Sequence, residues 1–220
     1  MSANLFRRVS CEAIGSFFLF ATVIGSGIMG ENLSGGNLAV ALLGNTAATS
    51  AMLFVLITML GPLSGAHFNP AVTLVMRLRG EIGTPDLLRY IAAQLVGGIL
   101  GVWAAHVMFG LPVLQFSDHA RSGAGQWLGE FIATFGLVLT ILGTAKLRPA
   151  AIPASVALYI AAAYWFTSST SFANPAITIA RSLSNTFAGI APADAPGFII
   201  AQLAGALAAH IAAKALFDGE

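Results

Sequence analysis

The sequence is short of charged residues. Asp, Glu, Lys and Arg make up 9% of its 220 residues, whereas about a quarter of the residues of a soluble domain are charged. So few charges cannot cover a water-facing surface, which excludes a soluble enzyme and a disordered chain. They also form no basic patch, so we expect no nucleic-acid partner.

Cysteine is almost absent, because Cys11 is the only one. A single thiol excludes an intrachain disulfide and any metal cluster held by several cysteines. No pair of ionisable residues in the apolar stretches has the spacing of metal ligands or of a general acid and base. We therefore expect no metal, no cofactor and no enzymatic activity.

Apolar sequence is abundant instead. Hydrophobic residues make up 57% of the chain, and the 24 glycines suit close packing of membrane helices. A spanning helix needs about 20 mostly apolar residues. Six stretches qualify, at roughly 9–30, 38–60, 87–109, 126–145, 152–170 and 196–217. The sequence predicts an all-α polytopic membrane protein with six transmembrane helices in a lipid bilayer.

Lys and Arg in the connections predict the orientation. Eight of the ten lie on the side that holds both termini and the connections after the second and fourth spans: Arg7, Arg8, Arg77, Arg79, Arg89, Lys146, Arg148 and Lys214. Positive connections stay in the cytoplasm, so both termini are expected there. Arg121 and Arg181 lie on the other side, and Arg121 is expected only to be solvated in its loop.

Two further segments are apolar but too short to cross. They run over 62–80 and 168–188, and each contains Asn-Pro. Non-helical backbone at membrane depth is tolerated only where it is buried in protein or lines a wet cavity. Because Asn is a favoured N-cap and Pro a favoured first helical residue, the pairs at 69–70 and 174–175 predict two short re-entrant half-helices.

The two halves of the chain repeat these features in order. The matched residues are Glu12 with Glu130, Asn69-Pro70-Ala71 with Asn174-Pro175-Ala176, and Gln94 with Gln202. Each half has three spans, so the second half enters the bilayer in the opposite sense. We expect a single domain over 1–220 that consists of inverted repeats 1–115 and 116–220.

The two half-helices are expected to begin near the membrane midplane. A helix N-terminus carries about half a positive elementary charge and unpaired N–H groups. Two such ends facing a narrow lumen oppose a cation, while the carboxamides of Asn69 and Asn174 offer donors to a passing oxygen atom. This arrangement favours neutral polar solutes. Asn-Pro also marks ordinary surface turns, but the matched positions in both halves favour the first interpretation.

The run Ser64-Gly-Ala-His-Phe-Asn-Pro-Ala-Val-Thr73 resembles the first signature of the aquaporin and aquaglyceroporin (major intrinsic protein) family. The run Ser171-Phe-Ala-Asn-Pro-Ala176 resembles its second signature, and the matched Glu and Gln positions extend the resemblance over nearly the whole chain. The resemblance implies six tilted helices and two half-helices around one pore per subunit, with the subunits assembled as a homotetramer.

The resemblance also implies roles for buried polar residues. Glu12 and Glu130 are implied to support the two re-entrant segments by accepting backbone hydrogen bonds, in a structural set that includes Gln94 and Gln202. His67 is implied to line or to brace the cytoplasmic arm of the pore. A buried glutamate without such hydrogen bonds would be protonated instead.

The narrowest point of the family uses four positions, which can be carried over by their spacing from the two Asn residues. They are Thr49, Ala162, Ser171 and Ile177. Water-selective members have a bulky aromatic residue and a His at two of these positions, and nearly all members have Arg at the last. None of the four is aromatic or charged here, so we expect a wider and less polar filter.

Arg181 lies four residues after Ile177, on the same helix face and about 6 Å further out. It either supplies the displaced charge at the outer mouth or pairs with acidic loop residues or lipid headgroups. Both interpretations are open at the level of sequence.

A few bacterial members resemble this chain in the run Asn-Pro-Ala, apolar residue, Thr-Ile-Ala-Arg-Ser-Leu, and they are associated with passage of trivalent arsenic hydroxides. The resemblance implies a passive channel of the plasma (inner) membrane for glycerol-like polyols, trivalent arsenic hydroxides and water. A water-selective aquaporin, an inverted-repeat secondary transporter and an ion channel are the alternatives. A transporter needs acidic residues for ion coupling, and Glu12 and Glu130 are expected to be committed to the scaffold.

Overall fold

The computed structural model describes residues 4–217, in which all regular structure is helical. The elements are α1 (Leu5–Leu33), α2 (Leu38–Ser64), α3 (Pro70–Leu78), α4 (Thr84–Met108), α5 (Ala124–Leu147), the 3-10 turn η1 (Pro149–Ala151), α6 (Ile152–Phe166), α7 (Pro175–Arg181) and α8 (Ala195–Phe217). Six helices, with η1 and α6 counted together, are long and apolar enough to cross a membrane. The six predicted spans are thus confirmed.

Two span ends differ from the expected ones for local reasons. Helix α1 begins at Leu5 rather than near residue 9, because the Asn4 side chain caps it by accepting the N–H of Arg7 at 2.9 Å. Helix α6 ends at Phe166 rather than near residue 170, because Thr167 is extended and its hydroxyl donates back to the Ala163 carbonyl at 2.7 Å. Ser and Thr hydroxyls commonly compete in this way with the backbone of a helix.

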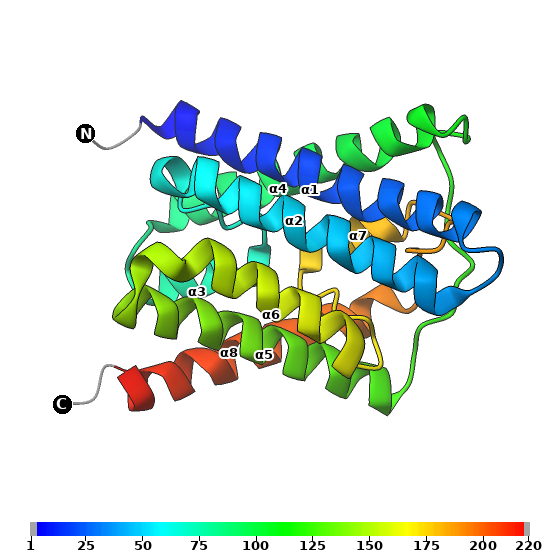
Figure 1. Ribbon diagram of the computed structural model, residues 1–220. Helices are drawn as coiled ribbons and strands as arrows, with labels where there is room; N and C mark the ends of the chain where they lie inside the picture. The colour runs from blue at the N-terminus through cyan, green and yellow to red at the C-terminus, as the bar shows by residue number, and fades with distance from the viewer. Residues whose placement is uncertain (1–3, 218–220) are drawn as a thin grey trace.

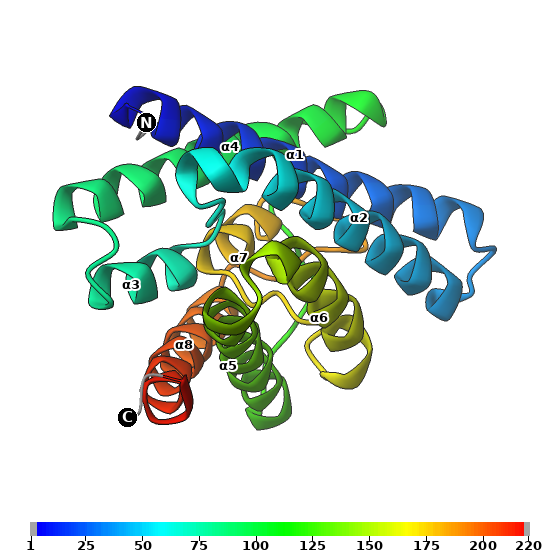
Figure 2. The ribbon, with the colours of Figure 1, turned by 60° about the vertical axis from the view of Figure 1, so that its left-hand side comes forward.

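The long helices form two groups with the short helices between them. Figure 2 shows α1, α2 and α4 on one side and α5, α6 and α8 on the other, with α7 between the groups. In Figure 1 both described chain ends lie at the same end of the bundle, α3 lies toward that end and α7 toward the opposite end. The two short helices therefore enter the bundle from opposite ends.

Glycines at matched positions permit close helix crossings in both halves. A Cβ at Gly97 of α4 would collide with the backbone carbonyl of Ala13 in α1. A Cβ at Gly205 of α8 would collide in the same way with the carbonyl of Phe131 in α5. Small residues allow helix backbones to approach this closely, so the correspondence between the two halves extends to the packing of the spans.

Helices α3 and α7 begin where the sequence predicts. The side-chain oxygen of Asn69 accepts the N–H of Ala71 at 2.9 Å, and that of Asn174 accepts the N–H groups of Ala176 at 3.0 Å and Ile177 at 3.3 Å. Each Asn is thus the N-cap of its half-helix, and each following Pro occupies the first turn. These caps aim both helix N-termini at the middle of the bundle.

Candidate functional site

A buried glutamate of α1 holds the backbone that leads into α3. Glu12 accepts the N–H of His67 at 3.0 Å and the N–H of Phe68 at 2.7 Å. Gln94 of α4 donates to the same carboxylate at 2.8 Å and to the Thr73 hydroxyl at 3.0 Å. The carboxylate therefore satisfies donors that a loop at membrane depth would otherwise leave unpaired.

Glu130 of α5 repeats this arrangement before α7. It accepts the N–H groups of Phe172 and Ala173, both at 2.8 Å. Gln202 of α8 donates to Glu130 at 2.6 Å and to the Thr178 hydroxyl at 2.9 Å. The backbone hydrogen bonds expected of both glutamates are present, and the two glutamines belong to the same networks.

These hydrogen bonds stabilise an unusual backbone. Ala66 and Phe68, three and one residues before the first Asn, have φ angles of 50° and 49°. Ser171 and Ala173, at the equivalent places before the second Asn, have φ angles of 52° and 48°. A side chain in this left-handed region costs of order 1–3 kcal/mol and persists where the surroundings enforce it. The glutamate networks supply that enforcement in both halves.

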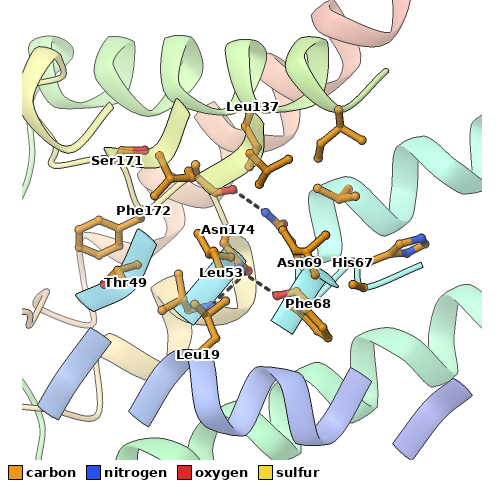
Figure 3. Close-up of a pocket in the computed structure, with 18 of the residues that line it drawn as sticks. Leu19, Thr49, Leu53, His67, Phe68, Asn69, Leu137, Ser171, Phe172 and Asn174 are labelled. Atoms are coloured by element: carbon orange, nitrogen blue, oxygen red, sulfur yellow. Dashed lines mark hydrogen bonds between the residues drawn. The ribbon is translucent and has the colours of Figure 1, made fainter. Parts of the chain in front are cut away.

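The two Asn carboxamides meet in the middle of the molecule. Asn69 donates from Nδ2 to the Ala173 carbonyl at 2.7 Å, and Asn174 donates from Nδ2 to the Phe68 carbonyl at 2.8 Å (Figure 3). A primary amide has two N–H groups, so each Asn retains one donor. Both residues line a cavity, and these free donors are available to its contents.

The cavity has a volume of about 220 Å³ and runs past both Asn residues. That is room for several waters, each of which takes roughly 30 Å³ in the liquid. In Figure 3, Thr49 and Ser171 lie toward one end, Asn69 and Asn174 in the middle and His67 toward the other end. Most of the wall is apolar, with aliphatic residues from α1, α2, α5 and α6 that include Leu19, Leu53, Leu137, Val156 and Ile160.

Three of the four predicted filter residues lie in this wall, and the fourth does not. Thr49, Ser171 and Ile177 are buried and line the cavity, whereas Ala162 is exposed and lies outside it. Helix α6 faces the cavity with residues spaced four apart, including Ile160 and Tyr164. A residue midway between them points to the opposite side of a helix, so the prediction for Ala162 is wrong.

Tyr164 lines the cavity, although its spacing from Asn174 did not predict it as a filter residue. It is 4% exposed, and its hydroxyl lies 3.4 Å from the Thr49 hydroxyl. Phe172 also lines the cavity. The absence of aromatic residues was predicted for the four filter positions only, and Tyr164 and Phe172 add rings to the wall beside them. Tyr164 lies four residues after Ile160, on the same face of α6, but only the structure shows that this face lines the cavity.

A positive charge lies in the wall beyond the filter positions, as one of the two interpretations of Arg181 has it. Arg181 at the end of α7 is 3% exposed and lines the cavity one helical turn beyond Ile177. Its Nε donates to the Ala188 carbonyl, and its Cζ lies 3.3 Å from the centroid of the Phe172 ring. The guanidinium is inside the molecule, which does not fit the alternative of an exposed contact with loop acids or headgroups.

Arg121 is more than a solvated loop residue. It donates from Nε to the Gly189 carbonyl at 2.7 Å, and its backbone N–H donates to the Asp194 carboxylate at 2.7 Å. Burial lowers the pKa of its guanidinium, and the nearby charge of Glu130 partly offsets this shift. An arginine nevertheless stays charged at neutral pH, so the end of the molecule near Arg181 holds a second positive group.

His67 both lines the cavity and braces its own segment. Its Nδ1 lies 3.2 Å from the Thr73 hydroxyl, and its ring packs edge-on against Tyr90 with 5.3 Å between the centroids. Within residues 4–217, no group of three or more His, Cys, Asp or Glu side chains is arranged to hold a metal ion. The polar groups along the cavity are the two Asn carboxamides, hydroxyl groups, the His67 ring, the Glu81 carboxylate and the Arg181 guanidinium.

Three comparisons with known proteins agree with this geometry. The family description "MIP: Major intrinsic protein" matches residues 1–172. Aquaglyceroporin AqpS of Rhizobium meliloti (strain 1021) is 54% identical over 206 residues, which cover 94% of this chain and 88% of that protein. Probable aquaporin PIP2-8 of Arabidopsis thaliana is 31% identical over 144 residues, which cover 63% of this chain and 52% of the plant protein.

Among solved structures, the aquaglyceroporin from Plasmodium falciparum aligns with a TM-score of 0.71 and 20% sequence identity, covering 94% of this chain and 95% of that chain. At that identity the likeness concerns the fold. The family match spans well over half of the chain, and members of the family are transport proteins rather than enzymes. The chain belongs to the major intrinsic protein family and is an aquaglyceroporin-type, multi-pass membrane channel.

Proposed function

We propose that the protein is a passive channel for small neutral polar solutes, namely glycerol-like polyols, trivalent arsenic hydroxides and water. The observation that carries the proposal is the cavity in which the free donors of Asn69 and Asn174 meet between aliphatic walls. A neutral solute with several hydroxyl groups can bond to the donors and pack its carbon side on the walls. The relative at 54% identity is named an aquaglyceroporin, which supports polyols as substrates.

The charges around the cavity support passage of neutral solutes over ions. Two helix N-termini and Arg181 contribute positive potential along the path. Glu12 and Glu130 bind backbone N–H groups and are not among the residues that line the cavity. Ion-coupled transporters and cation channels need acidic groups facing the path. Glu81 is the one acidic residue among those that line the cavity, and it is exposed and pairs with Arg79 at 3.3 Å, so both alternatives fit this wall poorly.

We propose that Thr49, Ser171 and Ile177 form the selectivity filter, with Tyr164 taking the place expected for Ala162. The Ser171 hydroxyl is buried in the wall without a protein hydrogen-bond partner among the described residues, which leaves it available to a solute hydroxyl. Ile177 stands where nearly all family members have Arg, and it removes the five donors of that side chain. A neutral trihydroxide resembles glycerol in shape and hydroxyl pattern, so such a filter suits both.

The setting in the membrane is also proposed. We infer that both termini lie in the cytoplasm from the excess of Lys and Arg at the end of the bundle that carries them, and that the membrane is the plasma (inner) membrane. The two sets of matched hydrogen bonds support inverted repeats over 1–115 and 116–220 within one channel domain. We propose the homotetramer from the family resemblance alone.

Stopped-flow light scattering on proteoliposomes tests the proposal with water, glycerol and neutral arsenous acid. Native vesicles should pass all three faster than empty vesicles. Ile177→Arg should slow glycerol and arsenous acid by about tenfold, which corresponds to about 1.4 kcal/mol of barrier, while Ile177→Val should leave the rates nearly unchanged. Equal glycerol rates in native and empty vesicles would contradict the proposal.

One observation favours a second candidate. Tyr164 places an aromatic ring in the wall with its hydroxyl 3.4 Å from the Thr49 hydroxyl, and water-selective family members also use a bulky aromatic residue at their constriction. A water-selective aquaporin would pass water in the same experiment and exclude both larger solutes.

A further inference from the structure

We propose that Arg121, in the connection between α4 and α5, is a positioning residue that holds the guanidinium of Arg181 in place at the end of the cavity and thereby limits cation leak. This inference rests on the proposed function, because it concerns the wall of the same conduit. Arg121 is not among the residues that line the cavity, whereas Arg181 is. Arg121 must therefore act through Arg181.

Both guanidinium groups lie near one aromatic ring. The Cζ of Arg181 is 3.3 Å from the centroid of Phe172, and the Cζ of Arg121 is 5.4 Å from the same centroid. The ring itself cannot move freely, because Glu130 accepts the N–H of Phe172 at 2.8 Å and Phe198 packs edge-on against it at 5.0 Å. Cations within about 6 Å of an aromatic face are attracted to it, so Phe172 links the two arginines.

Both arginines also bind one short run of backbone. Arg121 donates to the Gly189 carbonyl at 2.7 Å from Nε and to the Phe187 carbonyl at 3.4 Å from Nη2. The carbonyl between these two, that of Ala188, accepts the hydrogen bond from the Nε of Arg181. Arg121 thus holds the residues on either side of the acceptor that Arg181 needs.

The backbone at 187–189 is closely packed and has little room to move. A Cβ at Gly189 would collide with the Ser117 side chain and with the Ser184 carbonyl. The backbone N–H of Arg121 is anchored in turn by the Asp194 carboxylate at 2.7 Å. The connection that carries Arg121 is therefore hydrogen-bonded to Phe187 and Gly189, on either side of Ala188, and to Asp194 further along the chain.

The orientation of the Arg181 guanidinium depends on this support. No ion pair described within residues 4–217 includes Arg181 or Arg121, and the one described hydrogen bond of the Arg181 guanidinium is the bond to Ala188. Its Nη donors therefore remain available to the cavity that it lines. Arginine presents its donors in a rigid planar fork, which lysine lacks, so a lysine at 121 cannot hold two carbonyls and stack on a ring.

A double-mutant cycle in proteoliposomes tests the coupling. Potassium leak and glycerol flux are compared for the native chain, Arg121→Ala, Arg181→Ala and the double variant, with Arg7→Ala as an exposed control at the other end of the bundle. Each single variant should raise potassium leak several-fold, and the double variant should leak no more than Arg181→Ala. Multiplied effects of two independent sites, no effect of Arg121→Ala, or no effect of Arg181→Ala would overturn the inference.

A second measurement does not depend on solute flux. In detergent-solubilised protein that elutes as a single sharp species, methylglyoxal should modify Arg181 several-fold faster in Arg121→Ala and Arg121→Lys than in the native chain or in Arg7→Ala, as measured by peptide mass spectrometry. Equal rates would overturn the inference. If native vesicles pass no neutral solute, the proposed function fails while the modification rates still decide whether Arg121 positions Arg181.

Discussion

At the scale of single residues, we expect a few side chains in the wall to set what the cavity admits. Thr49, Tyr164 and Ser171 bring three hydroxyl groups to its wall, and Ile177 contributes an aliphatic surface next to them. Tyr164 has the largest side chain of the four, so we expect its ring to limit the width and its hydroxyl to add to the polarity. The two properties can be separated by substitution.

Tyr164→Phe keeps the ring and removes the hydroxyl that lies 3.4 Å from Thr49. We expect glycerol flux to fall by about twofold to tenfold relative to water, because one hydrogen bond is worth about 0.5–1.5 kcal/mol. Tyr164→Ala should instead raise the flux of polyols larger than glycerol. Stopped-flow light scattering measures both, and Ala162→Ser serves as a control outside the cavity. Unchanged selectivity in both Tyr164 variants would remove this residue from the filter.

At the scale of elements, each half-helix depends on a glutamate in a long helix. Glu130 reaches from α5 to the backbone just before α7 and binds two consecutive N–H groups, while Glu12 does the same from α1 for α3. The segments that lead into α3 and α7 contain residues with left-handed backbone. They are too short and too strained to keep this conformation without hydrogen bonds from elsewhere. A carboxylate suits this task because both of its oxygens only accept hydrogen bonds.

Glu130→Gln replaces one accepting oxygen by an amide that donates. One backbone N–H of the segment before α7 then loses its partner, and an unsatisfied buried group costs about 1–3 kcal/mol. The midpoint of thermal unfolding, followed by fluorescence-detected size-exclusion chromatography, should fall accordingly. Glu31→Gln changes an exposed glutamate of α1 and should leave the midpoint unaltered. Equal midpoints for the two variants would show that the carboxylate does not stabilise the segment.

At the scale of the whole molecule, two equivalent helix crossings hold the half-helices in one bundle. Helix α1 packs on α4 in the first half and α5 packs on α8 in the second. Gly97 and Gly205 permit these approaches at matched places, since a Cβ at either would meet a backbone carbonyl. Residues of both halves line the cavity, so a change in either crossing should alter both stability and flux.

Gly97→Ala and Gly205→Ala are each expected to destabilise the protein by about 1–3 kcal/mol, the usual range for overpacking in a close-packed interior. Gly44→Ala is the matched control, because a Cβ there meets nothing within 4 Å. It should be neutral or stabilising, since glycine inside a helix costs about 0.5–1 kcal/mol relative to alanine. Thermal midpoints of the three purified variants check the ranking, and a Gly97→Ala midpoint at or above the Gly44→Ala value would contradict it.

Much of this structure depends on neighbouring residues and could be predicted from the sequence. Six apolar runs of sufficient length predicted six spans, and Asn-Pro predicted both half-helix starts, because hydropathy and first-turn hydrogen bonds involve neighbouring residues. The matched Glu and Gln positions pointed to the networks around Glu12 and Glu130. The family resemblance extended these local features to a channel.

The sequence by itself thus determined the class, the spans, the half-helices and the middle of the cavity. Only the tertiary structure decided that Tyr164 rather than Ala162 enters the wall, because that depends on the rotation of α6 and on where the helix ends before the left-handed residues. Only the tertiary structure brought Arg121 beside Arg181, which lies far along the chain from it. Such placements depend on packing between distant segments, which no local pattern of residues specifies.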